Sequence, residues 1–145
     1  MFVAIIQITL VSLVFLAIYH FVCEGILAPS LRMKFRYHLF EQRDRLRSLK
    51  ISKKEEFDDW TYENLEYSIN TAIRLLNTYT VVGLWLAFRE LEKYPDIREE
   101  IEKVLHRLDE CPLEEVQEIR LAVNQVTLHA LGTNSLGWLI LLIPV

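Results

Sequence analysis

The first feature along the chain is a run of about twenty almost uncharged positions from Phe2 to Val22, rich in Val, Ile, Leu, Phe and Ala. A helix of that length crosses the roughly 30 Å of hydrocarbon in a bilayer. The run is longer than the apolar stretch of a signal peptide, has no basic residues before it and has no A-x-A site after it. The pattern therefore predicts an uncleaved transmembrane anchor over residues 1–27 rather than a cleaved signal peptide.

The next segment, residues 28–54, has a helical pattern with two adjacent stripes. Ala28-Pro29-Ser30 predicts a break and then a new helix with proline in its first turn. At 100° per residue, the apolar stripe holds Leu31, Phe35, Leu39, Leu46 and Leu49, and the stripe beside it holds Arg32, Arg36, Arg43 and Arg47. This predicts a basic amphipathic juxtamembrane helix. Two interpretations stay open: the arginines contact anionic lipid, or the leucines pack on the domain while the arginines are solvated or paired.

Residues 55–131 carry the pattern of a small helical bundle. Ser52 and Glu55 have the spacing of a capping box, which predicts a helix that pauses at residues 59–61 and continues to about Lys93. Residues 81–88 are apolar on every side, as in a helix buried in protein or membrane. The predicted helix that contains these residues also contains Arg74. A central arginine costs at least about 2.5 kcal/mol on membrane insertion, so we expect a central bundle helix rather than a second membrane pass.

Two further helices follow. Tyr94-Pro95 ends the preceding helix, and Asp96 with Glu99 predicts the cap of a short amphipathic one. Its apolar stripe holds Ile97, Ile101, Val104, Leu105 and Leu108. Cys111-Pro112 predicts the next break, and Gly132 predicts the end of the last helix. No strand alternation or repeat occurs, so the predicted fold class is all-α, a membrane protein with one transmembrane helix.

The tail, residues 132–145, is apolar and uncharged. As a helix it would rise about 21 Å, short of the hydrocarbon thickness. An apolar end left in water would favour aggregation, so we expect it to enter the leaflet, fold against the anchor, pack on a neighbouring subunit or cap the bundle. Trp138, Leu139 and Leu142 are the candidate contact residues.

Charge is divided unequally along the chain. Residues 28–54 carry nine Lys or Arg and two acidic residues, whereas residues 55–145 carry seven basic and seventeen acidic residues. The basic excess beside the anchor predicts the cell (inner) membrane as location, with the N-terminus outside and the bulk of the chain in the cytoplasm. The acidic body argues against a nucleic-acid partner. Two distant cysteines, Cys23 and Cys111, suit a reducing compartment.

Candidate chemistry is confined to the end of the anchor. His20 and Glu24 are four residues apart on one helical face, with Cys23 between them. They could gate protons, line a pore or bind a metal ion, although both side chains could also reach water at the interface. No zinc-module spacing, catalytic nucleophile signature or glycine-rich phosphate loop occurs, so we predict no cofactor and no metal site.

Three functions remain from the sequence. The expected one is a non-enzymatic integral membrane protein that forms a homo-oligomer and docks a protein partner through its cytosolic helices. The second is an oligomeric pore or membrane-disrupting effector triggered by a cytosolic signal, with His20 and Glu24 in the pore. The third is a membrane-bound enzyme that uses His20, Cys23 and Glu24.

Overall fold

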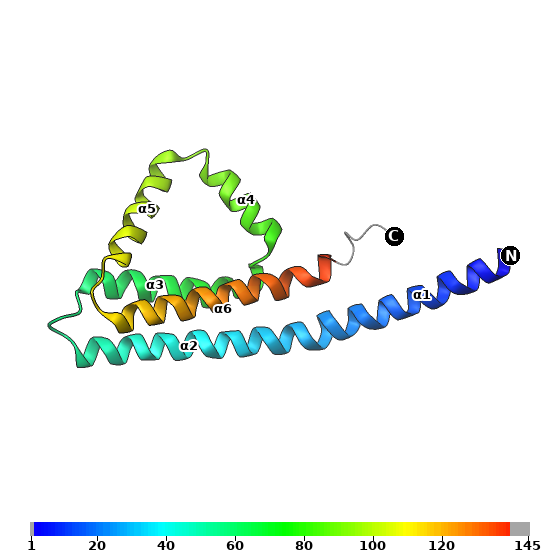
Figure 1. Ribbon diagram of the computed structural model, residues 1–145, viewed down its shortest axis with the longest axis horizontal. Helices are drawn as coiled ribbons and strands as arrows, with labels where there is room; N and C mark the ends of the chain where they lie inside the picture. Colours follow the sequence, from blue (N-terminus) through cyan, green and yellow to red (C-terminus); the bar gives the residue numbers. More distant parts are fainter. Residues whose placement is uncertain (1, 140–145) are drawn as a thin grey trace.

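The computed structural model describes residues 2–139, with the side chains of residues 2–135. Every regular element in this part of the chain is a helix, which confirms the predicted all-α class. Three helices, which end at Ser52, Leu75 and Leu139, lie side by side in an elongated bundle (Figure 1). The N-terminal helix projects beyond one end of this bundle.

The N-terminal half is one continuous helix. α1 (Phe2–Val22), the π-helical turn η1 (Cys23–Leu27) and α2 (Ala28–Ser52) follow one another without interruption. The predicted break at residues 28–30 is therefore wrong. Proline lacks an N–H and its ring collides with the carbonyl group four residues before it, and the wider turn directly before Pro29 relieves this conflict. In that turn the Ala28 N–H donates to the Cys23 carbonyl.

Among the described residues, this helix contains the one stretch that is long and apolar enough to cross a membrane. None of the residues of α1 is buried by the rest of the chain. The side chains of α1 are thus free to contact lipid along its whole length.

The second helix begins later than predicted. Ser52 ends α2, and its hydroxyl donates to the Leu49 carbonyl at 3.1 Å, so the predicted capping box at residues 52–55 is wrong. α3 (Asp59–Leu75) is instead capped by Asp58, whose carboxylate accepts from the Thr61 N–H at 3.0 Å. Asp58, which directly precedes α3, therefore caps this helix, and Ser52 does not.

The predicted continuous helix to Lys93 is also wrong. α3 passes into the short 3₁₀ turn η2 (Leu76–Thr78), and α4 (Val81–Leu91) starts anew with Thr80 as its cap. The Thr80 hydroxyl accepts from the Gly83 N–H at 3.0 Å. α4 therefore leaves the bundle in its own direction, and residues 81–90 are all exposed rather than forming the central helix.

The last two helices begin near the predicted prolines. α5 (Pro95–Asp109) has proline in its first turn, and Tyr94 rather than Asp96 occupies the cap position, without a side-chain hydrogen bond. α6 (Glu114–Leu139) continues through Gly132, where the helix was expected to stop. No described glycine has a positive φ, so Gly132 does not adopt the left-handed conformation of a C-terminal cap.

The core lies between α2, α3 and α6. α2 packs along both other helices, so the leucine stripe of the juxtamembrane segment faces the bundle. The segments on either side of the expected boundary at residue 54 therefore share one core. The buried cluster consists of Leu39, Leu46, Leu49, Phe57, Leu65, Ile69, Ala72, Leu76, Val116, Ile119, Val123 and Ala130. α4 contributes no residue to it.

Candidate functional site

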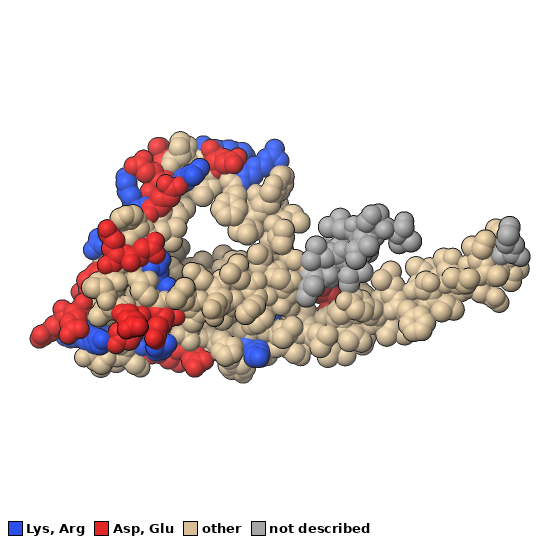
Figure 2. Space-filling view, viewed as in Figure 1, with Lys and Arg blue, Asp and Glu red and all other residues tan. Residues whose placement is uncertain are grey.

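The feature that distinguishes this bundle is a helical arm made of α4 and α5. The two helices leave the bundle as two sides of a triangle whose base is formed by α3 and α6 (Figure 1). We call residues 81–109 the α4–α5 arm. Figure 2 shows an open passage between this arm and the base.

Two polar residues of α6 hold the start of the arm. The Asn134 amide donates to the carbonyls of Leu76 and Tyr79 at 2.8 and 2.9 Å, and its oxygen accepts from Arg32 Nε at 2.7 Å. The next residue, Ser135, accepts from the Val81 N–H through its hydroxyl at 3.0 Å. Both polar side chains are buried. They therefore bind backbone groups of η2, of the residue after it and of the first turn of α4.

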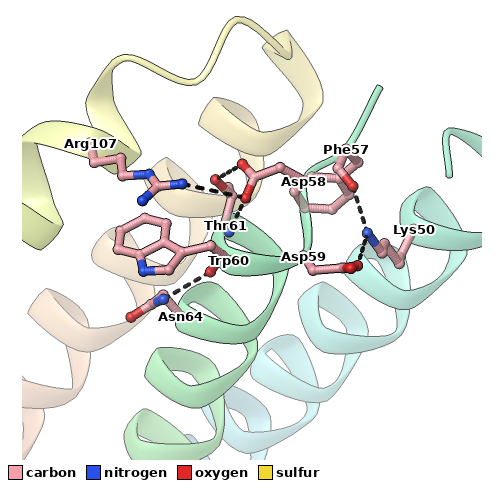
Figure 3. Close-up of polar contacts among 8 residues, drawn as sticks. All are labelled: Lys50, Phe57, Asp58, Asp59, Trp60, Thr61, Asn64 and Arg107. Carbon is pink, nitrogen blue, oxygen red and sulfur yellow. Dashed lines mark hydrogen bonds and ion pairs between the residues drawn. The ribbon is translucent and has the colours of Figure 1, made fainter. Parts of the chain in front are cut away.

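An aromatic and charged contact holds the far end of the arm on α3. The Arg107 guanidinium lies 4.0 Å from the centre of the Trp60 ring and 3.8 Å from the Asp58 carboxylate (Figure 3). The hydrogen bond from the Thr61 hydroxyl, with further contributions from the Thr61 N–H and Arg107, holds the pKa of Asp58 below its ordinary value. The start of α3 is thus joined to the end of α5.

α6 closes the same end of the arm. The Gln117 amide donates to the carbonyls of Leu108, Asp109 and Cys111 at 3.0, 3.3 and 3.1 Å. Arg120 lies 2.6 Å from the Asp109 carboxylate. Since these carbonyls belong to the last turn of α5 and to the segment directly after it, α6 binds both ends of the arm.

Between its two ends the arm exposes apolar side chains. On α5, Leu108 is buried in the base, whereas Ile97, Ile101 and Leu105 on the same stripe are 49%, 42% and 50% exposed. Because Leu108 points toward the base, the stripe faces the open passage. The opposite face of α5 carries charged side chains that pair within the helix, Arg98 with Glu102 and Lys103 with Glu99. The uncovered surface of α5 is therefore its apolar one.

The four arginines predicted to contact lipid lie on α2 beside the bundle. Three of them have partners inside the chain: Arg32 contacts Asn134 and Glu24, Arg43 contacts Phe40 and Asp44, and Arg47 contacts Glu66. Arg36 is half-buried and forms no ion pair among the described residues. The structure thus gives most of this stripe an internal role, and its contact with lipid stays a prediction.

Among the described residues, no ion pair joins the two candidate residues at the end of α1. Glu24 lies in the π-helical turn and its carboxylate is 3.7 Å from Arg32, while His20 is exposed and forms no ion pair in the described part of the chain. Cys23 is a free thiol beside them. Within residues 2–139 no group of three His, Cys, Asp or Glu side chains is placed to hold a metal ion.

The predicted tail contacts cannot be located in the fold. Leu142 and the side chains of Trp138 and Leu139 lie outside the described residues.

Comparisons with protein-family models, curated proteins and solved structures found no match to this chain.

The sequence did not single out the residues that hold the arm. A signal was present: Thr133-Asn134-Ser135 interrupts an otherwise apolar stretch of α6, and polar side chains inside such a stretch need partners when they are buried. Their partners lie more than fifty residues away along the chain, so spacing alone did not reveal them.

Proposed function

We propose that this chain is a non-enzymatic membrane protein that is anchored by α1, assembles with copies of itself through the α4–α5 arm, and presents its helices to a protein partner. The observation that supports this proposal is the apolar arm, which is exposed along its length although polar contacts hold both of its ends. Contiguous exposed apolar surface of this kind marks interaction sites in folded proteins.

The location follows from charge beside the span. Arg32, Lys34 and Arg36 follow α1, and no acidic residue occurs between Gly25 and Phe40. Such a basic excess is retained on the cytoplasmic side. We therefore place the bundle in the cytoplasm and the N-terminus outside, in the cell (inner) membrane. Reporter domains fused after Lys54 and after Glu110 should be active in the cytoplasm, and activity only outside the cell would reverse the orientation.

A second copy of the chain is the occupant that we assign to the stripe on α5. Anchoring confines copies to one plane and one orientation, which raises their effective concentration. A two-fold pair would bring the same stripe of Ile97, Ile101 and Leu105 together from both copies. The charged face of α5 stays in water in this arrangement because its side chains pair within the helix.

The test uses the full chain in lipid vesicles, with the number of subunits counted by single-molecule photobleaching. The parent chain should form oligomers, and the variant Ile101→Ser/Leu105→Ser should be monomeric. The matched control Glu99→Ser/Lys103→Ser changes the opposite face of the same helix without changing its net charge and should assemble like the parent. A monomeric parent, or equal assembly of the apolar variant, would contradict the proposal.

A further inference from the structure

Among the side chains that the structure describes outside the span, those of α4 are distinctive, because large apolar residues project from this helix over a wide arc. At 100° per residue the exposed residues cover about 200° of its circumference. They are Val81, Val82, Leu84, Trp85, Leu86 and Phe88, each between 44% and 65% exposed. A single neighbouring helix would bury only one stripe of this arc. An apolar surface this wide is typical of a helix that is surrounded by protein or in contact with lipid.

The charges around α4 favour lipid. Three segments form the half of the molecule nearest α1: residues 25–40, 67–89 and 121–135. None of them contains an aspartate or glutamate, and together they carry Arg32, Lys34, Arg36, Arg74 and Arg89. Glu24 lies directly before the first of these segments and pairs with Arg32. Figure 2 shows most of the other acidic side chains on its visible face at the opposite end of the bundle and on the outer part of the arm. The half nearest α1 is therefore basic and complements an anionic leaflet.

The position of α4 relative to the span is set by the contacts of α6. Val81 is bound to Ser135, and the adjacent Asn134 is bound to Arg32. Arg32 follows the last residue of α1 by ten positions, a rise of about 15 Å. α4 thus begins at the level of the basic residues that follow the span, and it runs obliquely to the direction of α1 (Figure 1).

We propose that α4 is an interfacial helix that lies on the bilayer that α1 crosses, with its apolar arc at the boundary of headgroups and acyl chains. Lys34, Arg36 and Arg89 then face anionic headgroups on the same side of the membrane. The Arg89 guanidinium lies 5.5 Å from the centre of the Trp85 ring, and both side chain types are common at this depth. This proposal goes beyond self-assembly, because it assigns lipid as the partner of α4, which contributes no residue to the core.

Tryptophan fluorescence tests the contact in the full chain. The variant Trp60→Phe/Trp138→Phe keeps Trp85 as the one tryptophan, and Trp85→Phe/Trp138→Phe keeps Trp60 as the matched control. Both are reconstituted in vesicles of phosphatidylcholine and phosphatidylglycerol that contain lipid brominated close to the headgroup. Trp85 should lose about half of its fluorescence, because an interfacial helix is buried to the depth of these bromines. Trp60, stacked under Arg107 at the acidic end, should keep its fluorescence.

A second measurement leaves all tryptophans in place. In a Cys23→Ser/Cys111→Ser chain, a nitroxide at Leu86→Cys should be more accessible to oxygen than to an aqueous nickel complex, and a nitroxide at Glu100→Cys should show the reverse. Equal quenching of Trp85 and Trp60, or water-like accessibility at residue 86, would overturn the proposal. Shielding of residue 86 that disappears when the protein is diluted with lipid would also overturn it and assign α4 to a second copy.

Discussion

At the residue scale, Asn134 joins three segments that are distant in the sequence. It binds the first residue of η2, the turn before α4 and Arg32 of α2. Asn134→Ala should lower the free energy of unfolding by roughly 2–4 kcal/mol, because one buried and one partly buried carbonyl lose this donor and Arg32 Nε loses its acceptor. Thermal unfolding in detergent measures this. Asn124→Ala, at an exposed position of the same helix, is the control, and an equal effect of both substitutions would contradict the role of Asn134.

Asp58 gives a pH-dependent prediction at the same scale. Its folded-state pKa is lowered, first by the Thr61 hydroxyl, so its stabilisation is complete above the ordinary value of 3.8 and is lost as pH falls through the folded-state pKa. Asp58→Ala should therefore cost about 1 kcal/mol at neutral pH and nearly nothing in strong acid. Melting curves over this pH range check it. The exposed Glu63 on the same helix is the control, and a cost for Asp58→Ala that does not change with pH would argue against the cap.

At the scale of elements, the arm depends on the side chains that bind its ends. Ser135→Ala removes the acceptor of the Val81 N–H and should loosen the first turn of α4. Hydrogen exchange at the α4 amides should become faster, while exchange in α3 and α6 stays unchanged. Thr133→Ala is the control, because that hydroxyl bonds only to the His129 carbonyl within its own helix. Unchanged exchange in α4 after Ser135→Ala would show that the arm is held by other contacts.

The helix breaks also show what local patterns decide. Pro95 and Pro112 mark real boundaries: α5 begins at Pro95, and α6 begins two residues after Pro112. Proline cannot donate the hydrogen bond that would continue the preceding helix. Pro29 does not mark a boundary, because the π-helical turn before it lets the helix continue. Likewise Gly132 has no positive φ and lies within α6, so it does not form the glycine cap that the sequence suggested.

At the scale of the whole molecule, the paired state of Glu24 bears on the pore alternative. Its carboxylate faces Arg32 and not His20, so we expect neither residue to be needed for assembly. His20→Leu/Glu24→Leu should leave the oligomer in vesicles unchanged and should not alter ion flux. Photobleaching and a liposome flux assay measure the two outcomes. Loss of an ion flux that the parent chain shows would favour the pore over the assembly protein.

The distribution of charge is a second property of the whole molecule. Arg43 and Arg47 lie on the part of α2 that follows Glu41, where acidic side chains pair with them, whereas Lys34 and Arg36 lie in the acid-free half. The expected lipid contact of the arginine stripe is therefore concentrated near Arg36. The spacing of the basic residues did not reveal the ion pair of Arg47, because its partner Glu66 comes from α3.

Sequence by itself determined the helical class, the apolar span and the apolar stripes of α2 and α5, because each depends on the spacing of residues a few positions apart. The tertiary structure decided which neighbour covers each stripe. Leu39, Leu46 and Leu49 of the α2 stripe are buried because α3 and α6 pack on them. Residues 81–88 are exposed because Thr80, Asn134 and Ser135 turn α4 away from that core. The contacts of Asn134 and Ser135 join residues more than fifty positions apart, so the free energy that selects them arises only when the chain has packed.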